Sequence, residues 1–399
     1  MTDYVANGSF ASLKANVRYL SSPDYAVLVR LTDHSNGWNG NYVYVSEKSY
    51  RFLKKSTVFP GDLIINNVGD TGKAFIVPNL GTPMTLGPNS ILVRPLDKAA
   101  IHTNYIFHFI KSPVGQAEIE KISSATTLKK FNKTAFRKIE FNVPAYEDQL
   151  RIAEILSKAE LLISQRKESI RLLDELLKST FLEMFGDPFV GDNIRPLGEY
   201  LRLQHGYAFK SGDFVDSGIP VIKIGTINKG YFDIKSLSFL NNHFGTGYDS
   251  YAIKPGELLI SLTGTVGKDD YANTCFVPNV FNFYLLNQRV AKLIPDERTL
   301  LKSYLDFLFK YPDFKRKLVK NNRGVRQANL SSSDIYSVKV NVPEISLQIE
   351  FSQIVEKTQA IKANYQTSLQ ELENLYGALS QRAFRGELMI GKTNVGNEA

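Results

Sequence analysis

Two short polar segments in each half of the chain carry residue types that contact phosphates and bases. The first is Gly69-Asp70-Thr71-Gly72-Lys73, which follows an apolar run, and its counterpart is Gly264-Thr265-Val266-Gly267-Lys268. Glycines allow close approach of the backbone and the lysine adds positive charge, so this segment favours contact with a phosphate. A tight turn in which the glycines only supply positive φ is an equally weighted alternative. The segment is not a nucleotide P-loop, because the Gly-x-x-x-x-Gly-Lys-Ser/Thr spacing is missing.

The second segment lies later in each half and is rich in Lys, Arg, Gln and Asn. It runs from Thr126 to Lys133 in the first half and from Arg323 to Asn329 in the second. Such side chains reach guanine and adenine edges or phosphates, although a solvated loop is the alternative for each segment taken singly. Tyr207 also belongs to the candidates, or else to the core. The predicted DNA-binding residues are Thr71, Lys73, Lys129, Lys130, Tyr207, Lys210, Thr265, Lys268, Arg323, Arg326, Gln327 and Asn329.

The sequence contains no recognisable catalytic or metal-binding pattern. Its five histidines are scattered, and with one cysteine, Cys275, no zinc pattern can be assembled. Asp187-Pro188-Phe189 is similar to the Asp-Pro-Pro-Tyr type of methyltransferase motif, but it lacks the second proline and a preceding glycine-rich cofactor motif. We interpret it as the end of a helix. We therefore expect no catalytic residue, cofactor or metal in this chain.

Two long segments must position these polar segments, and the first of them contains neither proline nor glycine up to Phe185. One starts after Asn142-Val143-Pro144 and runs to Phe185, and the other starts after Asn341-Val342-Pro343, at an offset of 199 positions. About 38 helical residues would span roughly 57 Å, so each segment predicts one long helix. The constant offset, which also relates Gln149 to Gln348, indicates an internal duplication.

Apolar residues recur at 3-4 spacing along the first predicted helix. The main stripe consists of Ile152, Ile155, Ala159, Leu162, Leu173 and Leu176. We expect it to pair with the second helix as an antiparallel coiled coil. A second stripe beside it consists of Leu156, Ile163, Ile170 and Leu177. Two paired helices bury only one stripe each, so the second stripe predicts a partner-binding surface, with packing against the globular domains as the alternative.

Composition describes a globular protein rather than a fibrous or membrane protein. The 399 residues are 43% hydrophobic and 22% charged, which allows two or three domains with real cores. A net charge of +8 is compatible with a polyanionic partner without proving one. A single cysteine excludes an internal disulfide, and no apolar run reaches membrane length. We expect a soluble, cytoplasmic protein.

Outside the long helices, both halves have the same order of short strands and one shorter helix. Phe59–Ile65 predicts a turn and a strand that recur at Lys254–Ile260. We predict a helix over Asn104–Ile119 and its counterpart over Leu301–Leu318. The predicted fold class is therefore α+β, with two mainly β domains in tandem, each followed by a long α-helix. The two helices would pack as an antiparallel coiled coil with pseudo-twofold symmetry.

Several motifs, each weak alone, form a specific ordered set. Met184-Phe185-Gly186-Asp187-Pro188 ends the first long segment, and Ala383-Phe384-Arg385-Gly386-Glu387-Leu388 ends the second. Gly206-Tyr207-Ala208-Phe209-Lys210 opens the second half, and Pro60-Gly61-Asp62-Leu63 recurs as Pro255-Gly256-Glu257-Leu258. With these motifs the chain resembles, over nearly its whole length, the specificity subunit of type I restriction–modification systems.

The resemblance implies a division of labour among subunits. Target-recognition domains at 1–143 and 188–342 would each read one half of a split, asymmetric double-stranded DNA site. Helical regions at 144–187 and 343–390 would set the unread spacer, and 391–399 would form a flexible tail. Two modification subunits would dock on the helices, bring S-adenosylmethionine and methylate a flipped adenine in each half-site. Two restriction subunits, using ATP and Mg, would join in a complete restriction system.

One departure from the family pattern limits the transfer of contacts between the halves. The first half lacks a counterpart of Gly206 to Lys210 and has only Ala11-Ser12-Leu13-Lys14-Ala15-Asn16. A stand-alone DNA-binding regulator is the main alternative function. A self-sufficient methyltransferase–nuclease is a second, against which the missing cofactor and catalytic motifs count. A partner helix on the second stripe would distinguish a specificity subunit from a regulator.

Overall fold

The computed structural model describes residues 1–124, 128–265, 270–319 and 327–387. The chain divides into two compact units, which we call unit 1 (residues 1–168 and 366–399) and unit 2 (residues 169–365). Each unit therefore contains a globular part and one portion of each long helix. Among the described residues, no helix is both long and apolar enough to cross a membrane.

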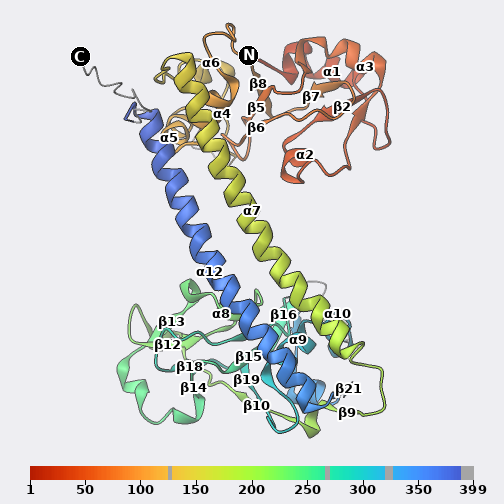
Figure 1. The fold of residues 1–399 in the computed structure, drawn as a ribbon, viewed down its shortest axis with the longest axis vertical. Coiled ribbons are helices and arrows are strands. Elements are labelled where there is room, and N and C mark those ends of the chain that lie inside the picture. Colours follow the sequence, from red (N-terminus) through yellow and green to blue (C-terminus); the bar gives the residue numbers. More distant parts are fainter. Residues whose placement is uncertain (125–127, 266–269, 320–326, 388–399) are drawn as a thin grey trace, which may run out of the picture. The chain divides into compact units, whose positions relative to one another are not determined.

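The two predicted long helices are present and equal in length. Helix α7 is Tyr146–Phe185 and helix α12 is Ile345–Phe384, each of 40 residues (Figure 1). The bounds keep the offset of 199 positions found in the sequence. A glycine with positive φ follows each helix, Gly186 at 66° and Gly386 at 76°. Glycine adopts this left-handed conformation without a Cβ penalty, which explains why both helices end there.

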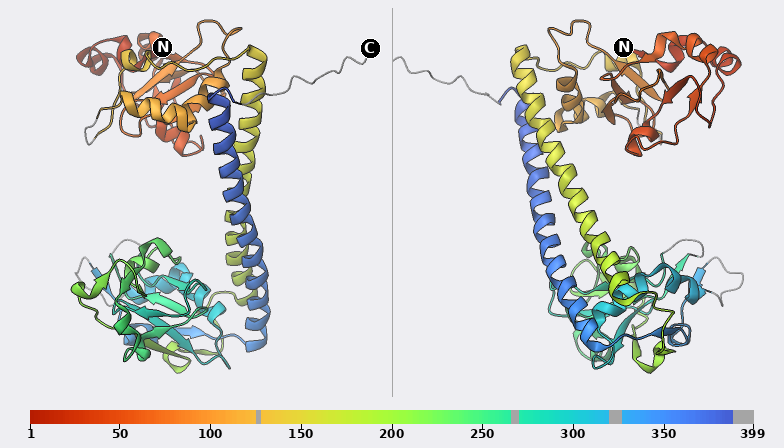
Figure 2. Two further views of the ribbon diagram at one scale, coloured as in Figure 1. Left: turned by 90° about the vertical axis from the view of Figure 1, so that its left-hand side faces the viewer. Right: turned by 45° about the vertical axis from the view of Figure 1, so that its right-hand side comes forward.

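The long helices run antiparallel within unit 1. The Tyr376 hydroxyl on α12 donates to the Glu160 carboxylate on α7 at 2.9 Å, and Lys167 pairs with Glu373 at 2.8 Å. Rising numbers on α7 therefore meet falling numbers on α12. Figure 2 shows the same opposed course from two further directions. The antiparallel pairing predicted from the sequence is confirmed.

Two of the four residues in the predicted partner-binding stripe are buried inside the protein, which contradicts the assignment of these two to a partner protein. Leu156 is 1% exposed and lies in the core of unit 1, and Leu177 is 1% exposed in unit 2. Ile163 and Ile170 are half-buried. The alternative of packing against the protein's own domains is therefore correct at the two ends of this stripe.

The predicted pairing stripe is correspondingly wrong at two positions. Leu162 and Leu176 are both 50% exposed. In unit 2 the long helices are joined by an ion pair of 2.5 Å between Asp174 and Lys362. The ring of Phe351 on α12 also lies 5.6 Å from that of Phe181 and 5.2 Å from that of Phe185 on α7. The spacing of apolar residues identifies the apolar stripes of a helix. It does not specify whether a stripe packs on the second helix or on a globular part, because both surfaces are available to each helix face.

Unit 1 contains two four-stranded sheets, ordered β1-β8-β5-β6 and β3-β2-β7-β4. Its strands are β1 (Thr2–Asp3), β2 (Ala26–Val29), β3 (Tyr44–Val45), β4 (Thr57–Val58), β5 (Leu63–Asn66), β6 (Ala74–Ile76), β7 (Met84–Leu86) and β8 (Ser90–Val93). Its shorter helices are α1 (Phe10–Asn16), α2 (Leu31–Ser35), α3 (Glu47–Phe52), α4 (Thr103–Lys111), α5 (Pro113–Ile122) and α6 (Lys133–Phe136). One core joins the first sheet, α4 and the α7 residues Ile152 and Leu156.

Unit 2 contains a four-stranded sheet (β10-β19-β15-β17), a five-stranded sheet (β11-β13-β12-β18-β14) and two two-stranded ribbons, β16-β20 and β21-β9. Its strands are β9 (Ile194–Pro196), β10 (Leu201–His205), β11 (Phe214–Val215), β12 (Ile219–Ile222), β13 (Ser238–Leu240), β14 (Ala252–Ile253), β15 (Leu258–Ser261), β16 (Thr263–Thr265), β17 (Thr274–Phe276), β18 (Tyr284–Leu286), β19 (Val290–Pro295), β20 (Gln327–Asn329) and β21 (Lys339–Asn341). Its shorter helices are α8 (Ile224–Ile227), α9 (Lys302–Lys310), α10 (Pro312–Val319) and α11 (Ser332–Tyr336).

The duplication is visible in the strand pairing of the sheets. The first sheet of each unit is antiparallel, with β5 between β8 and β6 in unit 1 and β15 between β19 and β17 in unit 2. The second sheet of each unit contains one parallel pair, β2 with β7 and β12 with β18. The structure thus confirms the predicted α+β class with two similar, mainly β units in tandem.

The shorter helices predicted over 104–119 and 301–318 are each broken in two. Helix α4 ends before Ser112 and α5 begins at Pro113, while α9 ends before Tyr311 and α10 begins at Pro312. Proline has no N–H to donate within a helix, and its ring clashes with the preceding turn, but it is accepted at a first helical position. Both breaks could have been predicted from these prolines.

The glutamines that recur near the start of the long helices have one structural role. The side chain of Gln149 accepts from the His102 amide and donates to the carbonyls of Ala100 and Pro144, each at 2.9 Å. Gln348 makes the same three kinds of bond in unit 2, the first with the Leu301 amide at 2.9 Å. Each buried amide therefore fastens a long helix to the loop before α4 or α9.

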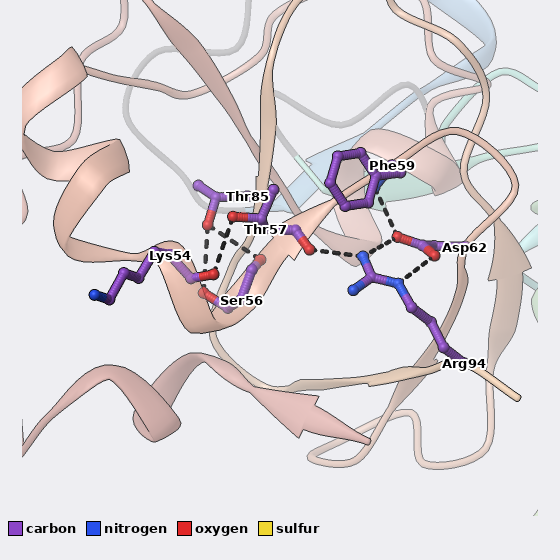
Figure 3. A network of polar contacts seen from close by, with 7 residues as sticks. All are labelled: Lys54, Ser56, Thr57, Phe59, Asp62, Thr85 and Arg94. Atoms are coloured by element: carbon purple, nitrogen blue, oxygen red, sulfur yellow. Dashed lines mark hydrogen bonds and ion pairs between the residues drawn. The ribbon is translucent and has the colours of Figure 1, made fainter. Parts of the chain in front are cut away.

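The acid of the repeated Pro-Gly-Asp/Glu-Leu motif stabilises the turn before the central strand. In unit 1 the Asp62 carboxylate accepts from the Phe59 amide at 2.6 Å and from Arg94 Nε at 2.6 Å (Figure 3). Arg94 also donates to the Thr57 carbonyl at 2.8 Å. In unit 2 the Glu257 carboxylate likewise accepts from the Lys254 amide, at 2.8 Å. Its ion-pair partner, Lys292 of β19, occupies the position of Leu92 and not that of Arg94. The motif therefore has a structural role in the sheet.

Candidate nucleic-acid interface

The Gly69–Lys73 segment forms the tight turn between β5 and β6. Gly69 and Gly72 both have positive φ, and the Gly72 amide donates to the Asn66 carbonyl at 2.9 Å. A Cβ on Gly72 would lie 3.1 Å from side-chain atoms of Gln116 and Ile119, which would have to shift, and the positive φ of 83° favours glycine independently. Thr71 is half-buried in this turn, and Lys73 is exposed.

The second polar segment of unit 1 lies directly beside this turn. The Gly69 amide donates to the Lys129 carbonyl at 2.8 Å, and Val68 forms an antiparallel bridge with Lys130. The Phe131 amide completes the pairing by donating to the Asn67 carbonyl at 3.1 Å. The structure therefore brings together two segments that lie about sixty positions apart in the sequence.

The lysines of this surface differ in the acids that surround them. Lys73 pairs with Asp70 at 3.3 Å, and Lys129 pairs with Glu120 at 2.5 Å. Within the described residues, Lys130 is exposed and forms no ion pair. An exposed ion pair is worth little, so both paired lysines can exchange their carboxylates for phosphates at small cost.

A cleft of about 560 Å³ beside the turn adds residues that the sequence did not single out. It is lined by Thr71, Lys73, Lys111 and His34, among others. Burial, followed by the charges of Lys111 and Lys73, lowers the pKa of His34. A neutral imidazole offers one donor and one acceptor, as base edges do. Neither residue could have been found from local sequence patterns, because each reaches the cleft from a different element.

In unit 2 the corresponding segments form the β16–β20 ribbon. Thr263 pairs with Asn329 and Thr265 with Gln327 in antiparallel register. A Cβ on Gly264 would lie 2.6 Å from atoms of Asp270 and Tyr271, so this glycine is needed for close packing. Asn329 is exposed on the ribbon.

The same two segments are thus joined in both units. The Leu330 amide donates to the Leu262 carbonyl at 2.8 Å, as the Phe131 amide donates to that of Asn67. This equivalence shows that the arrangement belongs to the duplicated fold and not to one unit alone. The four segments remain predicted DNA contacts, and the described parts of each pair are joined by backbone hydrogen bonds.

The predicted equivalence of Lys73 and Lys268 is not supported by strand register. The Asn66 amide donates to the Lys73 carbonyl at 2.8 Å, and in unit 2 the Ser261 amide donates to the Asn273 carbonyl at 2.9 Å. Asn273, directly before β17, therefore occupies the place of Lys73. The unit 2 connection is longer, so a constant sequence offset fails inside it. The recurrence of the lysine no longer argues for phosphate contact.

Tyr207 and Lys210 follow strand β10. The Tyr207 amide donates to the Leu286 carbonyl at 2.8 Å, and its ring lies 5.2 Å from each of Tyr248 and Tyr251. Tyr207 is 38% exposed, so it is part of an aromatic cluster and still reaches the surface. Lys210 is exposed.

The sequence showed no counterpart of this segment in the first half, but strand register places one in unit 1. Asp3 pairs with Ile91 in β1–β8, as His205 pairs with Ala291 in β10–β19. The residue after His205, Gly206, therefore corresponds to Tyr4. Residues 11–16 lie in helix α1 and are not the equivalent segment.

Part of the predicted interface lies outside the described structure. Lys268, Arg323 and Arg326 fall in undescribed segments, and only the backbone is described for Thr265 and Gln327. Across the residues that the structure does describe, no group of three or more His, Cys, Asp or Glu side chains could hold a metal ion.

Exposed apolar residues mark a second duplicated surface, on the long helices. They recur at the offset of 199 as Leu150 (40%) with Ile349 (47%), Leu162 (50%) with Ile361 (45%), and Leu176 (50%) with Leu375 (50%). Leu162 and Leu375 lie at one level of the helix pair in unit 1, between its two polar contacts. Leu176 and Ile361 lie beside the ion pair of Asp174 and Lys362 in unit 2. Each unit therefore carries the same three exposed apolar positions.

The chain was compared with known protein families and with curated proteins. The model of the type I restriction modification DNA specificity domain matches twice, at residues 14–172 and 192–374. The MjaVIII specificity subunit of a type I restriction enzyme from Methanocaldococcus jannaschii is 22% identical, over 96% of this chain and 92% of its own. The EcoBI specificity subunit from Escherichia coli is 20% identical, over 97% and 85%.

Solved structures give the same fold. The S subunit of a type I restriction-modification system from M. genitalium has a TM-score of 0.54 at 15% identity and covers 93% of this chain and 94% of its own. A chain from a study of complex assembly in a type I R-M system has a TM-score of 0.50 at 17% identity, covering 94% and 93%. Because the family model matches twice and spans most of the sequence, this chain belongs to the type I restriction modification DNA specificity family.

Proposed function

We propose that this chain is the non-catalytic specificity subunit of a type I restriction–modification complex. Each unit would read one half of a bipartite, asymmetric DNA site. The observation that carries this proposal is the joining, in both units, of two polar segments that are distant in sequence. A duplicated contact surface suits two half-sites on one duplex, which repeats roughly every 34–36 Å along its axis.

The long helices would fix the separation of the two half-sites. Helices α7 and α12 each have residues in both units, so each is a covalent link between them. A helix of 40 residues is about 60 Å long, and pairing stiffens it against bending. The length of the unread spacer would then depend on helix length and not on the residues that contact bases.

The exposed apolar positions on the long helices would dock the modification subunits. Leu162 and Leu375 offer an apolar surface in unit 1, and Leu176 and Ile361 offer its equivalent in unit 2. Exposed apolar residues grouped on helices favour a partner helix. Because the surface occurs once in each unit, two modification subunits are expected. S-adenosylmethionine, ATP and Mg would be bound by the modification and restriction subunits.

The test is to purify the chain with a type I modification subunit from the same organism and map N6-methyladenine in DNA incubated with S-adenosylmethionine. The proposal expects a split motif with one modified adenine in each half, seen only when both proteins are present. A chain that binds DNA alone and recruits no methyltransferase would instead be a regulator.

A further inference from the structure

Helix α5 borders the cleft beside the Gly69–Lys73 turn of unit 1. The side-chain amide of Gln116 on α5 donates to the Gly72 carbonyl at 3.2 Å and to the Ile110 carbonyl at 2.6 Å. Lys73 and Gln116 both line the cleft, and the side chain of Lys73 is 54% exposed. The neutral amide therefore fastens the helix to the turn, and the lysine adds a positive charge at the surface beside it.

Unit 2 has the same two kinds of side chain at the equivalent place, but each comes from the other element. Asn273 occupies the place of Lys73 by strand register. Helix α10 begins 199 positions after α5, so Lys315 occupies the place of Gln116. The lysine and the amide have thus exchanged elements between the two units.

The exchanged side chains are in direct contact in unit 2. Nζ of Lys315 donates to Oδ1 of Asn273 at 2.6 Å, and Nδ2 of Asn273 donates to the Asn228 carbonyl at 2.5 Å. Asn273 is 9% exposed, so its amide is a buried support, whereas Lys315 is only half-buried. The amide therefore holds the ammonium group of Lys315 at the place that Lys73 occupies in unit 1.

A third pair of positions shows that the exchange takes place on the same side of the sheet. Helices α2 and α8 each begin two residues after the equivalent strand, β2 or β12, so His34 corresponds to Ile227. His34 lines the cleft of unit 1. Ile227 directly precedes Asn228, whose carbonyl accepts from Asn273. Both His34 and Gln116 therefore have their counterparts beside Asn273 in unit 2.

Lys315 also lies close to the candidate DNA surface of unit 2. The hydroxyl of Tyr271 donates to the Lys315 carbonyl at 3.5 Å. The same Tyr271 packs so closely against Gly264 of the β16–β20 ribbon that a Cβ there would lie 2.6 Å from it. In unit 1 Lys73 belongs to the turn that is hydrogen-bonded to the Lys129 carbonyl. The exchanged lysine is thus next to the joined polar segments in both units.

The positive charge recurs in space although it does not recur at one position of the sequence. Fastening the helix to the turn requires no cation, because Gln116 does so in unit 1 without one. One lysine at this place in each unit, supplied by different elements, indicates a common anionic ligand. A lysine beside a DNA-binding segment most often contacts a phosphate of the backbone.

We propose that Lys315 is a phosphate contact of unit 2 and the spatial equivalent of Lys73 in unit 1. That the anion is DNA rests on the proposed function. The assignment does not depend on Lys268, which lies outside the described residues. It also explains how the two units keep one contact although the connection between their strands differs in length.

The first measurement exchanges the arrangements of the two units in the full chain. By fluorescence anisotropy with duplex DNA at several salt concentrations, Lys73→Asn should weaken binding and reduce the slope of log K against log salt concentration by about 1. Adding Gln116→Lys, which copies unit 2, should restore both quantities. The control K73N/Q370K has the same net charge but places the cation at an exposed position of α12, and it should not restore them. Equal recovery in both double variants would overturn the proposal.

Lys315→Gln makes the corresponding change in unit 2, and it installs the residue that unit 1 already has. It should reduce the salt slope by about 1. Arg316→Gln is the matched control, because Arg316 is the next residue of α10, is exposed and pairs with Asp313 at 2.7 Å. Thermal melting should show that both variants are folded. Equal effects of the two variants on DNA binding would overturn the assignment of Lys315.

The second measurement identifies the contacted phosphate. In the complex with a modification subunit, a neutral methylphosphonate replaces one phosphate of the duplex at a time. At one position it should weaken binding of the native complex and leave that of K315Q unchanged, which a purely structural role of Lys315 would not produce. The absence of any such position would overturn the proposal. Methylation mapping of the native complex tests the proposed function separately, because a split site can be methylated whether or not Lys315 contacts a phosphate.

Discussion

At the scale of single residues, Lys130 is the clearest candidate for a phosphate contact in unit 1. It is exposed, lies beside the Gly69 turn and forms no ion pair among the described residues, whereas Lys73 and Lys129 each have an acidic neighbour. A lysine that forms no ion pair does not have to break one before it binds a phosphate, so its full charge contributes to DNA binding. Burial in an ion pair would have reduced that contribution.

We predict that Lys130→Glu weakens binding of the complex to duplex carrying the first half-site. Replacing one phosphate contact should reduce the slope of log K against log salt concentration by about 1. Fluorescence anisotropy at several salt concentrations measures both quantities. Lys48→Glu makes the same change of charge on the exposed surface of α3 and should have a smaller effect. Equal effects of the two variants would show that Lys130 contributes only through the net charge of the protein and makes no specific phosphate contact.

His108 is a buried titratable residue that lies between the globular part of unit 1 and the long helices. Its Nε2 lies 2.9 Å from the Ser157 hydroxyl on α7, and its Nδ1 lies 3.4 Å from the Tyr376 hydroxyl on α12. Burial lowers the pKa of His108 from 6.5 to about 4, although Glu160 raises it in part. The imidazole is therefore neutral in the folded protein at neutral pH.

We predict that unit 1 loses stability as the pH falls from about 6.5 to about 4. In that window the unfolded state binds a proton at His108 and the folded state does not, so protonation favours unfolding. The difference in pKa corresponds to about 3 kcal/mol at the acid end. His108→Phe, which copies Phe307 of unit 2, should flatten the dependence of melting temperature on pH between those limits. An unchanged profile would show that other groups control the acid sensitivity.

At the scale of elements, the long helices separate structural from partner-binding positions. Buried positions, such as Leu156 of α7 in unit 1 and Phe351 of α12 in unit 2, fix each helix to a globular part. Positions such as Leu162 and Leu375 are exposed, although a helix in water favours polar residues there. Their recurrence in both units argues that one kind of partner docks twice.

We predict that Leu162→Ser with Leu375→Ser removes one modification subunit from the complex and leaves folding intact. Exposed apolar side chains add little to the stability of the chain alone, but their burial in an interface contributes about 25 cal/mol per Å². Native mass spectrometry should show one modification subunit in place of two. Leu96→Ser, at a fully exposed residue away from the helices, is the control. Two modification subunits bound to the double variant would show that this surface is not their docking site.

At the scale of the whole molecule, helix length should control the spacer independently of the half-sites. We predict that inserting four residues in both helices, between Glu168 and Ser169 and between Tyr365 and Gln366, lengthens the preferred spacer. Four residues add about 6 Å, close to two base pairs at about 3.4 Å each. Inserting in both helices keeps their contacts in register on each side.

Methylation mapping of the insertion variant measures both the spacer and the half-sites. The half-sites should be unchanged, because the segments that we propose to contact bases lie outside the helices. A single insertion, in α7 only, is the matched comparison and should reduce activity by disrupting the pairing with α12. Altered half-sites in the double insertion would contradict the proposal that the long helices alone set the spacer.

Much of the architecture could be predicted from the sequence because it depends on local signals. Positive-φ glycines and flanking prolines marked the ends of α7 and α12, and a constant offset showed the duplication. The same signals, applied to Pro113 and Pro312, would also have separated α4 from α5 and α9 from α10. Local chain stiffness and hydrogen-bonding capacity decide such features, and both are properties of the residues themselves.

Other features were decided only by tertiary structure. The inward turn of Leu156 and Leu177, the exposure of Leu162 and the replacement of Lys73 by Asn273 in unit 2 all depend on contacts between segments distant in sequence. The sequence determined which residues are polar, apolar or flexible and how often they recur. Which of several apolar stripes is buried, and which polar groups meet in one cleft, was settled by competition among all surfaces for the same space, because packing energy depends on neighbours that no local pattern contains.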